Sequence, residues 1–314
     1  MSGPLVTIAI PTYNRAAFSL PQALRCALAQ TYPDLEILVS DNCSTDDTER
    51  VVRSFGDPRV RYVRHPENIG ANNNFNYCIK EARGVYFLLF HDDDMIDPDL
   101  IDVLVTAAGE TPDVGLIRAG TRLIDADGVV LVEYPNRVGG LAMTEFILGW
   151  FAGKTSLYLC STLFNRRCLA EVGGLKSRHN LFQDVGAEMR VAARFGRVDV
   201  AAVKASFRMH SNVMYSESKI DQWCEDSLEL LDVLCDLVPA EDRARVRTEG
   251  MRYFCNKMYT YASRLPSQVA RLRTYWRIFG MFGRTYSPAH FVYFRDVRPR
   301  VNAVRRRAAR LAAG

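Results

Sequence analysis

The chain has 314 residues, of which 48% are hydrophobic and 24% are charged, a composition typical of globular proteins. No run of 18 or more apolar residues occurs, and the amino terminus lacks the basic and apolar regions of a signal peptide. We therefore expect neither a transmembrane helix nor secretion. The eight cysteines are scattered without a C-x-x-C pair, which favours reduced thiols in the cytoplasm over disulfides or a structural zinc site.

The net charge of +4 conceals a split along the chain. Residues 241–314 hold 17 Lys and Arg against 4 Asp and Glu, whereas residues 1–240 hold 23 against 32. This asymmetry indicates two parts, an acidic body and a basic carboxyl-terminal region.

Short apolar runs alternate with helical patterns as far as Phe90. Apolar residues recur at helical spacing from Leu20, and later stretches that follow Ser44 and Asn74 also predict helices. Strands that alternate with helices in this way form right-handed βαβ units, so we predict an α/β fold with a parallel sheet. The four predicted strands are Leu5–Ile10, Leu35–Ser40, Val60–Val63 and Val85–Phe90.

The middle of the chain predicts more strands before the pattern becomes helical. Val114–Ile117 and Leu157–Phe164 read as strands, and residues 121–124 and 129–132 flank the D-G turn of a hairpin. Residues 217–237 and 241–263 carry helical periodicity. Two histidines without a chemical context, His65 and His179, are predicted to lie at the surface.

Three consecutive carboxylates, Asp92 to Asp94, follow the fourth predicted strand. In parallel sheets ligands bind at the carboxyl ends of the strands, where Pro11–Arg15, Asp41 and Asn68 should also lie. Hard oxygen ligands suit Mg²⁺ or Mn²⁺ holding a phosphate, although a solvated acidic turn would show the same pattern. Neither G-x-G-x-x-G nor a P-loop occurs, which argues against a dehydrogenase and a P-loop NTPase.

Several motifs together resemble the family 2 glycosyltransferases. The resemblance covers roughly residues 4–215. It implies a GT-A fold, a Rossmann-like α/β domain with a mostly parallel sheet flanked by helices, that binds a nucleotide sugar. The domain would span residues 1–215, and residues 216–314 would form a mainly helical, basic region. The matching segments are VTIAIPTYNR, QTYPDLEILVSDNCSTDDT, HPENIGANNNFN and FLLFHDDDMIDPDLI.

The resemblance assigns roles to single residues around the nucleotide. Asp41 would accept a hydrogen bond from the base, and Asp93 would face the ribose. Asp92 and Asp94 would form a D-x-D-type site for Mn²⁺ or Mg²⁺, with Asp94 as a direct ligand; the family often has an acidic residue at the position of His91. The remaining nucleotide-sugar contacts would be Pro11, Thr12, Tyr13, Arg15 and Asn68.

A second group of candidates lies further along the chain. Asp184 begins a predicted helix, where a carboxylate is usually a cap or a partner of the helix dipole. Its position nevertheless resembles the family's E-D motif, with Gln183 in place of Glu, and the Asp of that motif is the catalytic base of inverting members. Glu188 is the alternative base, and Arg190 would orient carboxylates or phosphate. His210, in an R-x-H segment, would be a further metal ligand.

The resemblance implies a metal-dependent, inverting hexosyl- or deoxyhexosyltransferase that uses a nucleoside-diphosphate sugar in polysaccharide, glycolipid or other glycoconjugate synthesis. Two alternatives stay open: a sugar-nucleotide pyrophosphorylase, whose Gly-rich loop is absent, and a non-catalytic nucleotide-sugar- or glycan-binding protein. No module for nucleic-acid binding occurs.

The end of the chain predicts a basic amphipathic helix, with apolar residues repeating from Val297 to Leu311. Such a helix suits peripheral contact with the inner face of the cell membrane, or packing on the body or on a second subunit of a homo-oligomer.

Overall fold

The computed structural model describes residues 3–109, 113–209 and 216–298. The chain divides into two compact units. The first comprises Met1–Ser211 with Leu237–Pro239, and the second comprises Asn212–Asp236 with Ala240–Gly314.

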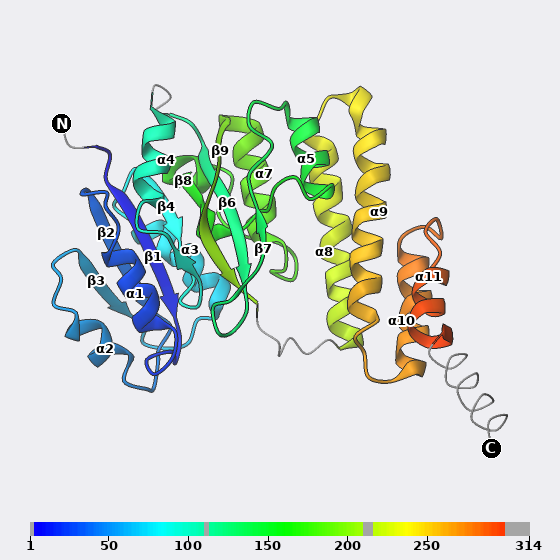
Figure 1. Cartoon of the computed structure of the whole chain (residues 1–314), viewed down its shortest axis with the longest axis horizontal. Coiled ribbons are helices and arrows are strands. Elements are labelled where there is room, and N and C mark those ends of the chain that lie inside the picture. The colour runs from blue at the N-terminus through cyan, green and yellow to red at the C-terminus, as the bar shows by residue number, and fades with distance from the viewer. Residues whose placement is uncertain (1–2, 110–112, 210–215, 299–314) are drawn as a thin grey trace, which may run out of the picture. The chain divides into compact units, whose positions relative to one another are not determined.

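The first unit is built on one mixed sheet with the strand order β3-β2-β1-β4-β8-β6-β9-β5, and β7 pairs with β6 beside this path (Figure 1). The strands are β1 (Val6–Thr12), β2 (Leu35–Asp41), β3 (Val60–Arg64), β4 (Tyr86–Leu89), β5 (Met95–Ile96), β6 (Leu116–Ile124), β7 (Val130–Tyr134), β8 (Thr162–Asn165) and β9 (Arg197–Arg208).

The amino-terminal half of the sheet is parallel, as predicted. β1 pairs in parallel with both β2 and β4, and β2 pairs in parallel with β3. Every residue of β1 and β2 is buried, because helices cover both faces of the sheet here. Thr12 lies opposite Asp41 in the register, so the ends of these two strands lie together at one edge.

The other half of the sheet is mixed and departs from the predicted strands. β8 runs antiparallel to β4 and β6, and β9 is parallel to β6. The segments predicted as separate strands at 114–117 and 121–124 form the single strand β6, whose hairpin with β7 is confirmed.

The predicted strand Leu157–Phe164 is wrong over its first part. Leu159–Ser161 is a 3₁₀ turn, and only the last residues enter β8. The carbonyl of Tyr158 accepts hydrogen bonds from the amide of Ser161 and from the Ser161 and Thr162 hydroxyls, which closes the chain into a turn. Side chains that satisfy the backbone locally compete with a strand ladder.

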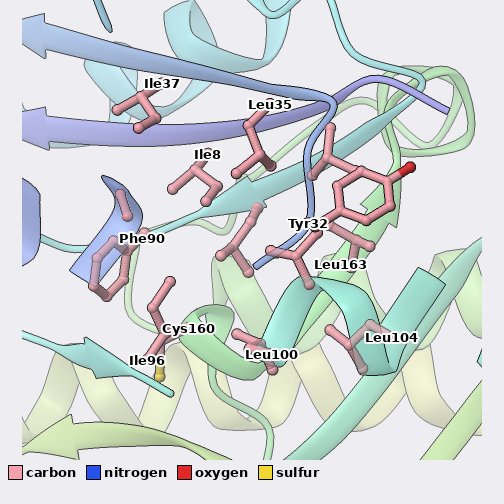
Figure 2. Packing of buried hydrophobic residues seen from close by; sticks show 14 of the residues in the cluster. Ile8, Tyr32, Leu35, Ile37, Phe90, Ile96, Leu100, Leu104, Cys160 and Leu163 are labelled. Carbon is pink, nitrogen blue, oxygen red and sulfur yellow. The ribbon is translucent and has the colours of Figure 1, made fainter. Parts of the chain in front are cut away.

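Helices cover the two faces of the sheet. The main apolar core lies between the sheet and one helical layer, where Ile8, Ile37 and Phe90 meet Leu100 and Leu104 (Figure 2). This layer consists of α1 (Leu20–Leu28), α2 (Thr48–Ser54) and α4 (Leu100–Ala108), and the opposite layer of α3 (Ala71–Glu81), α6 (Arg166–Glu171) and α7 (Gln183–Phe195), with α5 (Met143–Phe151) after β7.

The described residues of the second unit, 216–236 and 240–298, are mainly helical, as predicted, whereas the basic helix predicted from Val297 to Leu311 lies outside the described residues from 299 on. Tyr259 and Tyr275 are fully buried in the second unit, with ring centroids 5.8 Å apart. In the described residues no helix combines the length and the apolar character needed to cross a bilayer. The helices of the second unit are α8 (Glu217–Asp236), α9 (Arg243–Ala262), α10 (Gln268–Met281) and α11 (Ala289–Phe291), followed by a π-helix at Val292–Val297.

Candidate active site

An open cavity of about 460 Å³ lies at the carboxyl ends of the parallel strands, where the sequence predicts ligand binding. The loop after β1 and the turn after β4 form much of its wall. The predicted site residues that line it are Pro11, Thr12, Tyr13, Arg15, Asp92 and Asp93. The lining also includes residues to which the sequence assigned no site role, among them Asn42, Asn74, Phe75, His91, Phe207 and Arg208.

The end of β1 is hydrogen-bonded to the acidic turn after β4. The Thr12 hydroxyl donates a 2.6 Å hydrogen bond to Asp92 Oδ2, and both residues are buried. Burial raises the pKa of Asp92 to about 6, the Thr12 hydrogen bond lowers it, and the neighbouring charge of Asp93 raises it. Asp92 is therefore held in a fixed position inside the cavity wall.

Asp94 is almost fully buried behind the same turn. Its Oδ1 accepts a 3.0 Å hydrogen bond from the backbone amide of Arg208 at the end of β9. Its Oδ2 lies 3.7 Å from His91 Nδ1. Burial raises the pKa of Asp94, and the contact with His91 opposes that rise. Burial raises the pKa of the Cys160 thiol, and the nearby charge of Asp94 raises it further.

The acidic turn has the properties of a cation site. His91, Asp93 and Asp94 each offer one ligand atom, and these atoms lie within 4.8 Å of one another. Asp94 Oδ2 and His91 Nε2 are buried and have no hydrogen-bond partner among the described residues. Two carboxylates and an imidazole suit Mn²⁺ or Mg²⁺ better than a soft metal, and a divalent ion would offset the cost of leaving these atoms unpaired.

This cluster differs from the predicted metal ligands. It contains His91 and Asp93, while Asp92 is engaged by Thr12. His210 lies outside the described residues. The signal for His91 was present in the sequence, because it directly precedes the three carboxylates.

Arg208 joins the acidic turn to the β6–β7 hairpin. It is the Arg of the R-x-H segment, but no role was predicted for it from the sequence. Its Nε donates to the Asp93 carbonyl at 2.8 Å, and its Nη1 donates to the carbonyls of Asp125 and Ala126 at 3.1 and 2.9 Å. Because its guanidinium also lines the cavity, Arg208 is both a structural link and a candidate ligand contact.

Asp41 and Asn68, predicted to contact the nucleotide, are not among the residues that line the cavity. Asp41 is 1% exposed, and its two oxygens accept hydrogen bonds from the Tyr62 hydroxyl at 2.5 Å and the Ser44 amide at 2.8 Å. Burial and the Asp41 charge raise the pKa of Tyr62. Asn68 accepts from the side chain of Asn42 at 2.8 Å. In this conformation both residues support the cavity wall from behind.

His65 is 7% exposed, so its predicted surface position is wrong. Its Nε2 lies 3.0 Å from Asn74 Oδ1 and 3.2 Å from the Ser40 hydroxyl, which itself donates to Asn74 at 2.6 Å. The group connects β2, the loop after β3 and α3. Buried polar side chains persist where partners satisfy them, and here those partners hold Asn74 at the cavity wall.

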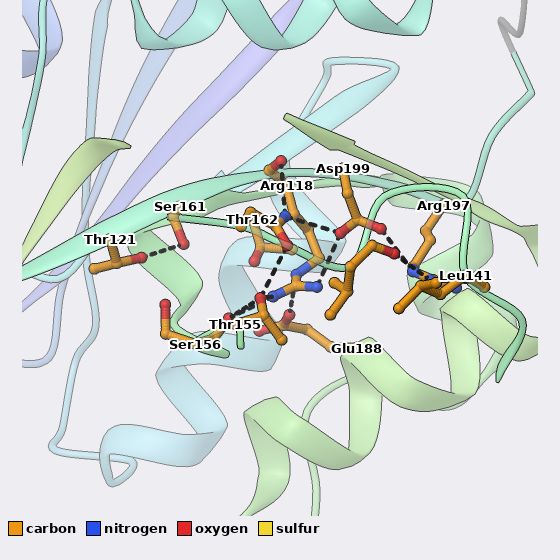
Figure 3. Close-up of polar contacts among 12 residues, drawn as sticks. Arg118, Thr121, Leu141, Thr155, Ser156, Ser161, Thr162, Glu188, Arg197 and Asp199 are labelled. Atoms are coloured by element: carbon orange, nitrogen blue, oxygen red, sulfur yellow. Dashed lines mark hydrogen bonds and ion pairs between the residues drawn. The ribbon is translucent and has the colours of Figure 1, made fainter. Parts of the chain in front are cut away.

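Asp184 lies in the first turn of α7 and is partly buried; it does not line the cavity. Glu188, one turn later, is fully buried, and its Oε2 lies 3.0 Å from Arg118 Nε (Figure 3). Burial raises the pKa of Glu188 to about 8, Arg118 lowers it, and the nearby Asp184 charge raises it. Its position inside the protein makes Glu188 a poor partner for an incoming acceptor.

Arg118 is the centre of a buried polar network between β6 and α7. Its Nη1 lies 3.1 Å from Asp199 Oδ1, and its Nη2 donates to the Thr155 hydroxyl at 2.9 Å. Asp199 also accepts from Arg197 Nε at 2.7 Å. Asp199 thus pairs with both arginines, and the Glu188 carboxyl lies on the other side of Arg118, so the buried guanidinium has polar partners on several sides.

Arg190, on another face of α7, is partly buried. Its Nε and Nη2 atoms have no hydrogen-bond partner among the described residues, and burial lowers the pKa of its guanidinium. Its role toward phosphate or carboxylates stays a prediction.

The sheet is half parallel, helices cover both of its faces, and an acidic turn follows β4. These features are those of the GT-A class of fold. Two solved structures share it. Staphylococcus aureus TarS 1–349 in complex with UDP-GlcNAc superposes with a TM-score of 0.64 at 14% sequence identity, over 88% of this chain and 81% of that one. A mannosyltransferase from Pyrobaculum calidifontis, in complex with GDP-Man and Mn²⁺, superposes with a TM-score of 0.53 at 17% sequence identity, over 94% of this chain and 84% of that one.

Residues 7–133 match the model of glycosyl transferase family 2. An uncharacterized glycosyltransferase of Rickettsia felis is 40% identical over 128 residues, which are 40% of this chain and 21% of that protein. Chondroitin synthase of Escherichia coli is 32% identical over 127 residues, 40% of this chain and 18% of that enzyme. The match therefore covers about a fifth of the length of each of these relatives.

Proposed function

We propose that the protein is a metal-dependent glycosyltransferase that moves a sugar from a nucleoside-diphosphate sugar to an acceptor hydroxyl with inversion. One observation carries the proposal: the open cavity borders a cluster of His91, Asp93 and Asp94 in which Asp94 Oδ2 and His91 Nε2 are buried without a hydrogen-bond partner among the described residues. A divalent cation that also binds phosphate would both occupy the cavity with a ligand and give these buried atoms a partner. The TarS and mannosyltransferase structures, which hold nucleotide sugars, support the choice of donor.

The cavity residues suggest how the donor would be held. Arg15 lines the cavity and offers a positive charge to a diphosphate. Thr12 and Arg208 fix the acidic turn from its two sides, so its carboxylates keep their positions while a charged donor binds. Mn²⁺ or Mg²⁺ held by His91, Asp93 and Asp94 would neutralise the charge of the departing diphosphate.

The proton of the acceptor hydroxyl needs an acceptor on the protein. We assign it to Asp184, because it is partly accessible at the start of α7 while Glu188 is enclosed. The paired Arg118 and Glu188 anchor α7 one turn below Asp184. A base placed opposite the leaving group would give inversion in a single displacement.

The test is a panel of UDP-, GDP-, dTDP- and CDP-sugars, incubated with Mn²⁺, with Mg²⁺ and with EDTA. We expect release of one nucleoside diphosphate that depends on the cation, and NMR of the transferred or hydrolysed sugar should show the inverted anomer first. Tight binding without release would favour a non-catalytic nucleotide-sugar-binding protein. Formation of a nucleotide sugar from a sugar phosphate and a nucleoside triphosphate would favour a pyrophosphorylase.

A further inference from the structure

The second unit displays large apolar side chains that its core does not use. Val269 and Trp276 of α10 are 71% and 63% exposed, and they lie seven residues apart, which places them on one face of the helix. Tyr293 and Phe294 of the π-helix are 52% and 47% exposed. Several large exposed apolar side chains on one helical unit are uncommon unless they meet a partner.

These side chains stand on two elements that are firmly held to each other. The guanidinium of Arg271 donates hydrogen bonds of 2.9 and 2.5 Å to Asp296, which is 5% exposed. The rings of Tyr275 and Phe291 lie with centroids 6.3 Å apart. The buried contacts fix α10 against residues 289–298, and the four apolar side chains are displayed from this fixed frame.

Positive charge accompanies the apolar residues. Phe294 lies between His290, with ring centroids 4.5 Å apart, and Arg298, whose guanidinium carbon is 5.3 Å from the ring centroid. Arg284, Arg295 and Arg298 are exposed, and none of the three has a carboxylate partner among the described residues. An arginine over an aromatic ring keeps its charge available to a second anion on the open side.

Negative charge is nearly missing from this part of the sequence. Residues 250–314 hold 14 Lys and Arg and a single acidic side chain, Asp296, which is buried against Arg271. Glu217 and Asp221 of α8 pair with Arg273 and Arg277 and so neutralise those two arginines. The exposed charge carried by residues 284–298 is therefore positive.

We propose that the surface formed by Val269, Trp276, Tyr293 and Phe294, with Arg284, Arg295 and Arg298, docks on an anionic lipid bilayer. Trp and Tyr favour the headgroup region, where their rings are apolar and their polar atoms remain hydrated. Arginines near the surface contact lipid phosphates, and each adds to the affinity. The aliphatic side chain of Val269 favours a bilayer over a nucleic acid, which offers bases to aromatic rings but little to an exposed valine.

Co-sedimentation of the full chain with vesicles tests the proposal. Vesicles of phosphatidylcholine with 30% phosphatidylglycerol are compared with phosphatidylcholine alone, at low salt and at about 0.5 M NaCl. The variants are Trp276→Ser with Phe294→Ser, and Arg295→Gln with Arg298→Gln. The matched control is Leu131→Ser, since Leu131 is 56% exposed on β7 of the first unit. Thermal melting checks that all variants fold.

We expect the wild type and Leu131→Ser to bind the anionic vesicles equally and the zwitterionic vesicles at least about tenfold more weakly. Each double variant should lose about tenfold or more in partitioning, and high salt should weaken wild-type binding by screening. The proposal is overturned if the wild type does not bind anionic vesicles, or if Trp276→Ser with Phe294→Ser partitions like Leu131→Ser. It is also overturned if an RNA or DNA oligonucleotide abolishes vesicle binding at equimolar concentration.

This test is independent of the proposed transferase activity, because its readout is partitioning alone.

Discussion

The backbone amide of Arg208 donates a hydrogen bond to the side chain of Asp94, a residue 114 positions earlier in the chain. The contact joins the end of β9 to the turn after β4, and the Arg208 side chain then extends over that turn to the Asp93 carbonyl. The acidic turn is thus supported by an element that enters the sheet late in the sequence.

Arg208→Ala should weaken donor binding while leaving the fold intact. The substitution removes the side-chain hydrogen bonds to Asp93, Asp125 and Ala126 but keeps the backbone bond to Asp94. Losing several such bonds should cost about 1–3 kcal/mol in holding the turn. Calorimetry with the nucleoside diphosphate that the panel identifies should show roughly tenfold weaker binding. Arg208→Lys keeps the charge without the planar guanidinium, so its affinity should lie between those of the wild type and Arg208→Ala. Wild-type affinity in both variants would rule out a role of Arg208 in donor binding.

Asp94→Asn should remove most of the dependence of nucleotide binding on Mn²⁺. Asparagine keeps the size of the side chain but supplies a weaker, uncharged ligand in place of the unpartnered Oδ2. We expect the affinity measured with Mn²⁺ to fall by about ten- to a hundredfold, and the affinity in EDTA to change little. Asp127→Asn, at the exposed tip of the hairpin, is the matched control. If both variants titrate with Mn²⁺ like the wild type, the cluster is not the cation site.

Asp184→Asn should nearly abolish turnover without changing donor affinity. Removal of a general base typically costs about 10²–10⁴-fold in rate. Steady-state kinetics with the cognate donor give kcat, and calorimetry gives the Kd of the donor analogue. A variant that turns over at the wild-type rate removes Asp184 from the role, whereas a loss of donor binding would indicate that its contribution is structural.

Glu188→Gln should change how stability depends on pH. Burial raises the folded-state pKa of Glu188 to about 8 from its ordinary value of 4.5. The unfolded chain therefore releases this proton first as pH rises, and the wild type loses stability between about pH 4.5 and 8. Glutamine has no proton to release, so the free energy of unfolding of the variant minus that of the wild type should increase over this interval.

We expect this difference in the free energy of unfolding to grow by a few kcal/mol between about pH 4.5 and 8, because each unit of pKa shift corresponds to about 1.36 kcal/mol. Above about pH 8 the difference should level off. Urea unfolding at pH 5, 6.5, 8 and 9 measures it. Two curves that stay parallel across this range would show that Glu188 remains ionised, paired with Arg118, throughout.

The parallel half of the sheet could be predicted because its information is local. Each of β1 to β4 is a short apolar run next to a helical pattern, and their polar ends identify the edge where a ligand binds. The antiparallel insertion of β8 between β4 and β6 could not be predicted in the same way. Its pairing joins Phe87 to Phe164, and no local pattern encodes a partner so far along the chain.

The same distinction applies to the site. The cavity-lining residues Thr12 and Asp92 are near the predicted strand ends and were found. No role was predicted for Arg208 because its importance depends on contacts with Asp93 and Asp125. His65 was misplaced because its partners, Ser40 and Asn74, come from other elements. Long-range hydrogen bonds are invisible in a single sequence.

The antiparallel pairing of β4 with β8 also limits where a shorter expressed fragment of this chain can end. The family segment ends at residue 133, so an expression fragment with that boundary would contain β4 but would leave out Phe164 and Asn165, its ladder partners. The fragment would present the buried edge of β4 to solvent and to other fragments, which invites intermolecular strand pairing. A usable minimal fragment must extend past β9, well beyond residue 133, where the match to the family model ends.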